Sequence, residues 1–274
     1  MKKVKTISFF SLILSSLFLL PFAAQAESTK VSVSGSSTLA PLAAEIAKRL
    51  EESDSSLRVD VQTGGSSKGI TDVIKGLSDV GMSSRALFPE EEAIVKSHTV
   101  ALDGVAFVVN SKNPVKELSQ AQLANIYSGK ISNWKELGGQ DLEITVIDRA
   151  KGRSEKELVK DYLGIKAAAY KPDVVAGENQ QCVKLLEGNQ GALVYLSIGT
   201  TEFEQKRSSK IRALPLSGVA ATAENVKNGS FPIIRPLVLI TKKELSPSSK
   251  EFVQFAVSSQ VKDLVEGMAF VAPQ

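Results

Sequence analysis

Three short stretches rich in serine, threonine and glycine contain the residues best suited to holding a ligand. They are Gly35-Ser36-Ser37-Thr38, Gly64-Gly65-Ser66-Ser67 and Ser83-Ser84-Arg85. Serine and threonine hydroxyls donate hydrogen bonds, and the backbone N–H groups of glycine-rich turns can approach a ligand closely. Donors directed at one point from several loops would replace the water around a compact oxyanion. The expected chemistry of these stretches is therefore anion binding.

Each stretch lies where a predicted strand ends and a predicted helix begins. Residues 31–34 alternate valine with serine, which predicts a strand, and apolar residues recur at helical spacing over 39–50. Residues 57–77 repeat this plan. A helix N-terminus presents free N–H groups and the positive end of the helix dipole, so it favours an anion. Ser37 or Thr38 is expected to cap the first helix, and an ordinary capped helix without a ligand is the alternative explanation.

A third strand is predicted at 80–82, directly before Ser83 and Ser84, and a further helix is expected to begin near Pro89. In an open α/β sheet, ligands bind outside the carboxyl ends of the strands, where the following loops gather. The alternation of strands and helices therefore predicts an α/β fold with the three serine-rich loops at one edge of the sheet. Chance clustering of a common residue is the alternative.

An arginine follows a further predicted strand in the second half of the chain. The strand ends at Arg149, a loop passes through Gly152, and apolar residues at helical spacing come next. Ser154 and Glu157 match the capping-box pattern, which accounts for the start of this helix without any ligand.

The scarcity of histidine and cysteine argues against several kinds of chemistry. His98 is the single histidine and Cys182 the single cysteine, so a histidine-based zinc site, a Ser-His-Asp triad and an internal disulfide lack material. His98 is expected to be a solvated residue after a helix. We predict no catalytic residue, no metal and no cofactor.

The first 26 residues predict a cleaved signal peptide. Three lysines precede an apolar run, and Ala24-Gln25-Ala26 has the small-x-small pattern of a signal peptidase site. Serines and a proline interrupt the run, so a membrane anchor is the weaker interpretation. Without these three lysines, the 33 Lys and Arg fall to the same number as the 30 Asp and Glu, which removes the compositional support for nucleic-acid binding. We expect a soluble, exported protein, located in the periplasm.

Taken in order, the serine-rich stretches resemble the early motifs of the phosphate-binding proteins that serve phosphate ABC transporters. The motifs are GSSTLAPL, GGSSKGI and DVGMSSR, and the likeness continues in LDGVAFVVN, LANIYSGKISNWKELGG and GALVYLSIG. The segment around Trp134 is the most specific of these. The resemblance covers essentially the whole chain after the predicted signal peptide.

This resemblance implies a two-lobed type II periplasmic-binding-protein fold. In that fold each lobe is a mixed sheet flanked by helices, and two strands cross between the lobes. The crossings are expected at 104–109 and 233–240. Residues 27–108 plus 234–274 are then assigned to lobe 1, and residues 109–233 to lobe 2.

The resemblance also implies a monomeric binding protein that captures inorganic phosphate by lobe closure and presents it to an inner-membrane ABC permease. Asp103 is the expected acceptor for a phosphate proton, which would discriminate phosphate from sulfate. The expected donors are Ser37, Thr38, Ser67, Ser84, Arg149 and Ser154.

One loop departs from the family pattern. Family members usually continue from the arginine and a short spacer into Gly-Ser-Gly-Thr, whereas Arg149 and Gly152 are followed here by Arg153-Ser154-Glu155. Either Arg153 supplies a charge of its own to the anion, or the loop shifts so that Ser154 takes the serine's role. A receptor for arsenate, molybdate or tungstate is therefore the alternative function, ahead of an exported phosphatase with a serine nucleophile.

Overall fold

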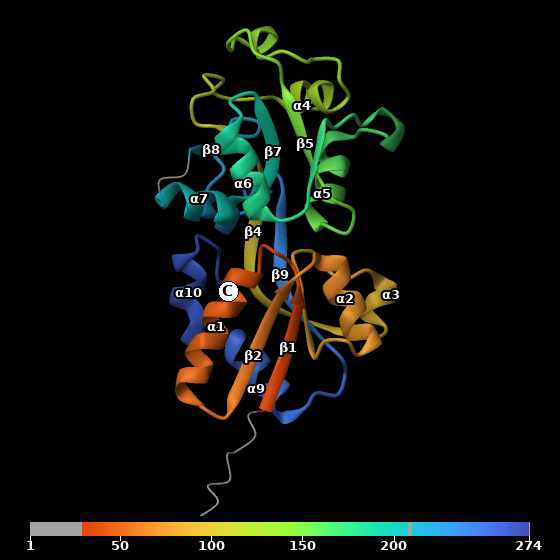
Figure 1. The fold of residues 1–274 in the computed structure, drawn as a ribbon, viewed down its shortest axis with the longest axis vertical. Coiled ribbons are helices and arrows are strands. Elements are labelled where there is room, and N and C mark those ends of the chain that lie inside the picture. The colour runs from red at the N-terminus through yellow and green to blue at the C-terminus, as the bar shows by residue number, and fades with distance from the viewer. Residues whose placement is uncertain (1–28, 208–209, 274) are drawn as a thin grey trace, which may run out of the picture.

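The computed structural model describes residues 29–207 and 210–273, which form an elongated α/β molecule (Figure 1). Two groups of helices and strands lie one beyond the other along the long axis, and β4 (Lys96–Asn110) and β9 (Ile234–Thr241) run between them. The predicted signal peptide lies outside the described residues. Within the described ranges, no helix has the length and apolar character needed to cross a membrane.

The elements predicted from periodicity in the first part of the chain are confirmed. The other strands are β1 (Thr29–Gly35), β2 (Leu57–Thr63), β3 (Val80–Ser83), β5 (Thr145–Arg149), β6 (Val174–Ala176), β7 (Ala192–Ser197) and β8 (Ile211–Ala213). The α-helices are α1 (Ala40–Ser53), α2 (Ser66–Lys75), α3 (Pro89–Glu92), α4 (Gln120–Tyr127), α5 (Ser154–Leu163), α6 (Asn179–Gly188), α7 (Ile198–Lys206), α8 (Ala223–Lys227), α9 (Pro247–Ala256) and α10 (Lys262–Gly267). Short 3₁₀ helices cover Trp134–Leu137, Ala167–Ala169 and Ser259–Val261.

The described strands form a nine-stranded mixed sheet in the order β2-β1-β3-β9-β4-β7-β5-β6, with β8 also paired to β4. β1 pairs parallel with both β2 and β3, so the carboxyl ends of these three strands lie at the same edge. β4 pairs antiparallel with β9 over its first part and with β7 and β8 over its second part. A single strand of 15 residues therefore links the two groups of elements.

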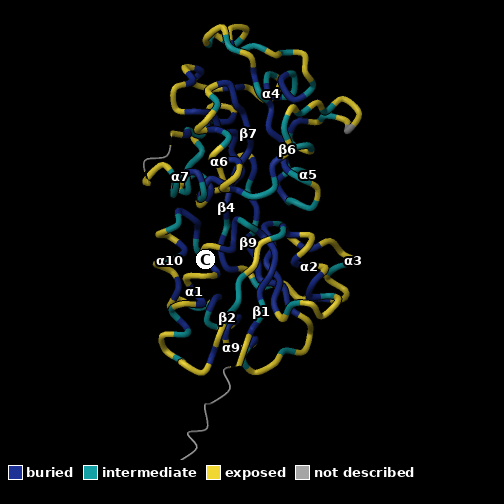
Figure 2. The backbone as a smooth tube through the Cα atoms, viewed as in Figure 1, coloured by how far each residue is buried: buried dark blue, intermediate teal, exposed yellow. Residues whose placement is uncertain are grey.

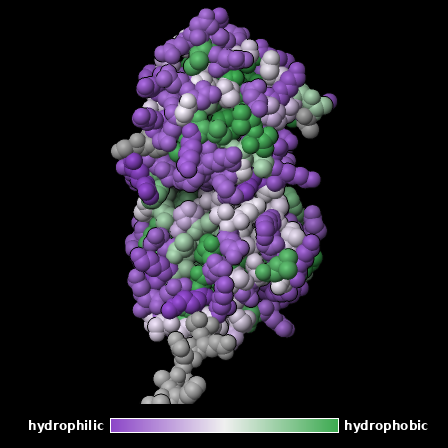
Figure 3. Space-filling view, viewed as in Figure 1, coloured by the Kyte–Doolittle hydropathy of each residue, from purple (hydrophilic) through white to green (hydrophobic). Residues whose placement is uncertain are grey.

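Each group has its own packed interior. In the group that contains α1, the apolar faces of α1 and α9 cover the sheet through residues such as Leu42, Ile46 and Phe252. In the other group, Phe107 and Tyr195 form an edge-to-face aromatic pair at the centre of the core. Figure 2 shows the buried backbone following the strands and the exposed segments at the periphery. The face shown in Figure 3 is mostly hydrophilic, with a broad apolar patch over the upper group and smaller apolar areas over the lower group.

The two crossing strands are where the sequence predicted strands, and one nearby prediction is wrong. The strand expected at 104–109 is part of β4, and the one expected at 233–240 is β9 shifted by one residue, while the lobe boundaries stay a prediction. His98, expected as a solvated residue after a helix, is neither fully solvated nor outside regular structure. It lies half-buried within β4, with Nε2 3.0 Å from Thr241 Oγ1, because pairing with β9 extends β4 back to Lys96. Burial and the nearby Lys96 charge lower the pKa of His98.

Candidate functional site

The three serine-rich loops meet outside the carboxyl ends of β1, β2 and β3, as the sequence predicted. Ser84 is at their centre, since its Oγ accepts a hydrogen bond from the Ser36 hydroxyl at 3.0 Å and lies 3.3 Å from Ser66 Oγ. The Ser84 backbone N–H also donates to Ser66 Oγ, at 3.1 Å. All three serines are buried. The parallel pairing of the strands thus brings together hydroxyls that are far apart in the sequence.

In the first loop, the N-cap position of α1 is Leu39, and no side chain caps the helix. Ser36 Oγ accepts from the N–H groups of Thr38 and Leu39, at 3.2 and 3.3 Å, and α1 begins one residue later. The expectation that Ser37 or Thr38 caps the helix is therefore wrong. Because the turn closes on Ser36, the Thr38 hydroxyl is available for contacts with the opposite group of elements.

The second loop directs Ser66, and not Ser67, into the cluster. Gly65 has a φ of 98°, which allows the chain to turn sharply into α2. Ser66 is then the first helical residue and faces inward, while the next residue is rotated by about 100° around the helix axis. The side chain of Ser67 is exposed, and its backbone N–H donates to the carbonyl of Gly152 at 3.3 Å. The structure does not bring the Ser67 hydroxyl to the buried cluster.

The N-terminus of α5 faces these loops from the other group of elements. Ser154 Oγ lies 2.7 Å from Ser84 Oγ, and the Thr38 hydroxyl donates to Glu155 Oε1 at 3.2 Å. The predicted capping box is wrong, since Arg153 is the N-cap residue and its side chain makes no capping hydrogen bond. Ser154 is the first residue of the helix, so its hydroxyl points into the interface between the two groups.

Arg235, which the sequence analysis did not select, links this interface to the crossing strands. Its guanidinium donates from Nη1 to Ser154 Oγ at 3.1 Å and from Nη2 to Thr38 Oγ1 at 3.2 Å. Nη1 also forms an ion pair with Glu155 at 3.0 Å. Arg235 is 1% exposed and is the second residue of β9. An arginine inside an otherwise apolar predicted strand was the signal in the sequence that could have revealed it.

Asp103 lies behind Arg235 on β4. Its Oδ2 accepts two hydrogen bonds from the Arg235 guanidinium, at 2.9 and 3.0 Å. Oδ1 accepts from the Ser197 hydroxyl at 3.0 Å and from the backbone N–H of Gly199 at 3.2 Å. Burial raises the pKa of Asp103, and Arg235 opposes that effect by favouring the charged form. In this geometry the carboxylate orients Arg235.

Arg149 is the last residue of β5 and is fully buried, and its side chain makes no hydrogen bond to the three serine-rich loops. It donates to Cys182 Sγ at 2.9 Å, to the Gly177 carbonyl at 3.0 Å and to Asn179 Oδ1 at 2.8 Å. Asn179 in turn donates from Nδ2 to Thr38 Oγ1 at 3.2 Å. The Arg149 side chain therefore acts on the interface through Asn179, a residue that the sequence analysis missed. Its Nε atom has no hydrogen-bond partner among the described residues.

Arg153 lies at the rim of the interface and not at its centre. Its guanidinium forms an ion pair with Glu178, with Nη2 2.6 Å from Oε1. Nη1 lies 3.4 Å from the hydroxyl of Ser37, which belongs to the first loop. The Arg153 side chain thus connects the first loop with the residue before α6 at the edge of the interface, and its charge is paired with Glu178.

Buried charges of both signs lie in and around the site. The cations are Arg149 and Arg235, and the anions are Asp103, Glu155 and Asp148, of which Asp148 pairs with Lys156. Burial opposes ionisation of Glu155, but the charges of Arg235 and Arg149 outweigh it and lower its pKa from 4.5 to about 2. Among the described residues, no cluster of three or more His, Cys, Asp or Glu side chains could hold a metal ion.

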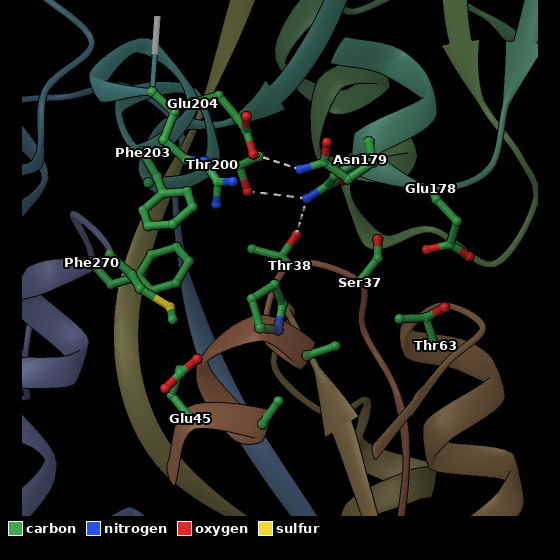
Figure 4. A pocket seen from close by; sticks show the side chains of 17 residues that line it. Ser37, Thr38, Glu45, Thr63, Glu178, Asn179, Thr200, Phe203, Glu204 and Phe270 are labelled. Atoms are coloured by element: carbon green, nitrogen blue, oxygen red, sulfur yellow. Dashed lines mark hydrogen bonds between the residues drawn. The ribbon is translucent and has the colours of Figure 1, made fainter. Parts of the chain in front are cut away.

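A cavity of about 550 Å³ opens beside this cluster (Figure 4). Thr38 from the first loop points toward Asn179 and Thr200, and Asn179 donates to both hydroxyls. Phe203 and Phe270 form an apolar part of the lining. Thr38 and Asn179 therefore belong both to the buried cluster and to the lining of this cavity, whereas Ser84, Ser154 and Arg235 do not line it.

The comparisons with known proteins agree with this architecture. Residues 21–260 match the family model described as the PBP superfamily domain. The phosphate-binding protein PstS of Bacillus subtilis is 30% identical over 250 residues, which cover 89% of this chain and 81% of that protein. PstS of Borreliella burgdorferi is 27% identical over 250 residues, which cover 88% of this chain and 89% of that protein.

Solved structures give the same result. A crystal structure from Clostridium perfringens with bound phosphate, assigned to the substrate-binding proteins of phosphate ABC transporters, has a TM-score of 0.84 and 32% identity. It covers 90% of this chain and 100% of its own. An ABC-type phosphate transport receptor from Vibrio cholerae has a TM-score of 0.70 and 28% identity, over 89% of this chain and 100% of its own.

The fold and the site between its two groups of elements define a ligand-binding protein of the type II periplasmic class. The relatives that it matches are described as binding proteins and as a transport receptor. With a family match over most of its length and a relative at 30% identity, the chain belongs to the PBP superfamily and, within it, to the PstS family of phosphate-binding proteins.

Proposed function

We propose that this protein captures inorganic phosphate between its two lobes in the periplasm and delivers it to an inner-membrane ABC permease. The observation that carries the proposal is the convergence of donors from both groups of elements on one buried place. Ser84 and Ser154 approach within 2.7 Å from opposite sides, and Arg235 reaches both Ser154 and Thr38. The names of the relatives support phosphate as the anion.

The proposed lobes are residues 27–108 plus 234–274 and residues 109–233. Each lobe contributes part of the donor set, so the anion has all its donors only when the lobes are closed. Binding then shifts the population toward the closed form, which is the form that the permease would recognise. Ser84 would contribute from lobe 1, Ser154 from lobe 2, and Arg235 from the crossing strand β9.

A thermal shift assay tests the proposal. A ligand at 100 times its dissociation constant adds about 2.7 kcal/mol to the free energy of unfolding, which raises the melting temperature of a protein of this size by about 5–10 °C. We expect this rise with phosphate and a much smaller one with sulfate. A flat response to phosphate with a rise for arsenate, molybdate or tungstate would transfer the function to that anion. Turnover of a chromogenic phosphate ester would show that the protein is a phosphatase.

A further inference from the structure

The Glu155 carboxylate lies within the donor set that the proposed function assigns to phosphate. Glu155 is the second residue of the ten-residue helix α5 and is 3% exposed. Its Oε1 accepts a hydrogen bond from the Thr38 hydroxyl at 3.2 Å and lies 3.0 Å from Arg235 Nη1. A carboxylate is itself an oxyanion, and it here contacts a hydroxyl of one group of elements and the guanidinium of a crossing strand.

The buried charges around Arg235 also indicate that the Glu155 carboxylate takes the place of a bound anion. Arg235 shares two hydrogen bonds with Asp103 behind it, and its Nη1 is directed at Glu155 and Ser154. The Arg149 charge also acts on Glu155. With Asp103 and Glu155 ionised, the Arg235 guanidinium is already paired with two carboxylates of the protein. An added anion would therefore bring a negative charge into a balanced, desolvated site, which is unfavourable.

We infer that Glu155 sets the affinity of this site by acting as an internal competitor, because its carboxylate holds the oxyanion position and phosphate binds only by displacing it from Arg235 and Thr38. The inference rests on the proposed function for the location of the ligand. Glu155 is thus a specificity-determining residue of the site.

The test compares phosphate dissociation constants, measured by isothermal titration calorimetry, for the wild type and three variants. Glu155→Gln removes the charge at nearly constant size, and Glu155→Thr also opens space and adds a hydroxyl donor. Glu157→Gln is the matched control, because Glu157 lies in the same first turn of α5 but is exposed. Both Glu155 variants should bind phosphate more tightly by about tenfold or more, since charge-assisted donors are released. The control should bind like the wild type.

A measurement on the wild type makes the test independent of how the variants fold. The carboxyl ¹³C signal of Glu155, assigned by comparison with the Glu155→Gln spectrum or by selective labelling, should shift when phosphate is added. The signal of Glu157 should stay in place. Two results would overturn the inference and leave the proposed function intact. In the first, the wild type binds phosphate but its Glu155 signal does not shift. In the second, the wild type binds phosphate as tightly as both Glu155 variants do.

The remaining outcomes distinguish a failure of the Glu155 inference from a failure of the proposed phosphate-binding function. If Glu155→Thr binds phosphate and the wild type does not, the internal competitor is supported and phosphate capture by the wild type is refuted. If the wild type and both folded Glu155 variants all fail to bind phosphate, the proposed function is refuted and the inference with it.

Discussion

The substitution Arg235→Met should make the protein unfold at a markedly lower temperature. Arg235 pairs with Asp103 at 2.9 Å and with Glu155 at 3.0 Å, and all three side chains are buried. Methionine keeps an apolar stem but leaves two buried carboxylates without this cation. Removing one partner of a buried ion pair costs about 3–5 kcal/mol. For a protein of this size the melting temperature should then fall by about 6–20 °C.

Circular dichroism melts at pH 7 measure this effect, with Arg49→Met as the control. Arg49 also pairs with an aspartate, Asp263, at 2.7 Å, but at the surface, where water and salt screen the interaction, so its removal should change the melting temperature little. The loss in Arg235→Met should shrink as the pH falls from about 7 toward 4, because the unpaired carboxyls of the variant can take up protons. A melting temperature within about 2 °C of the wild type would refute the reasoning.

Adding Glu155→Gln to Arg235→Met shows how much of the lost free energy of unfolding comes from the unpaired Glu155 carboxylate. In the double variant Arg235→Met with Glu155→Gln, one of the two unpaired carboxylates is neutral. Part of the lost free energy of unfolding should therefore return relative to Arg235→Met alone. A double variant less stable than Arg235→Met would mean that Glu155 stabilises the fold through some contact other than the one with Arg235.

Three further predictions concern other parts of the site. The depression of the Glu155 pKa from 4.5 to about 2 should contribute about 3 kcal/mol of stability above pH 4.5 that is lost as the pH falls toward 2. Urea unfolding should show this slope in the wild type and a shallower one in Glu155→Gln, and equal slopes would contradict it. Ser66→Ala should weaken phosphate binding by about 5–20-fold in calorimetry, because it removes a buried partner of Ser84, whereas Ser67→Ala at the exposed neighbour should not; equal effects would place the site elsewhere. Gly35→Ala should destabilise the protein by well over about 2 kcal/mol in the same urea assay, because Gly35 has a φ of 138° and the added Cβ would lie 2.2 Å from a backbone carbonyl. Gly138→Ala, where nothing lies within 4 Å, should cost about 1–2 kcal/mol, and the reasoning fails if both cost the same.

The local pattern of the chain was enough to predict where most of the site comes from. Alternating valines before Gly35 and helical spacing after Thr38 predict a strand, a turn and a helix, and all three are present. The same argument holds for the loops at Ser66 and Ser84. Periodicity reports which residues are buried, and parallel strands place the following loops at one edge, so the meeting of these loops could be expected.

The identity of the inward-facing residue in each loop could not be predicted in the same way. Ser36 closes the turn before α1, whose N-cap is Leu39 and not Ser37 or Thr38, and Ser66 faces inward where Ser67 was expected. A shift of one residue at the start of a helix rotates a side chain by about 100°, and such a shift depends on the turn conformation and not on composition. The capping-box pattern at Ser154 failed for the same reason.

The sequence by itself determined the class of fold, the strand ends that supply the donors, and the departure of the loop after Arg149 from its family pattern. Only the tertiary structure decided that Arg235 joins Asp103 to Glu155, and that the Glu155 carboxylate lies among the proposed phosphate donors. The physical reason is distance along the chain. Arg235, Asp103 and Glu155 come from β9, β4 and α5, and only the packing of these three elements brings their charges within hydrogen-bond range. No local pattern encodes such a contact.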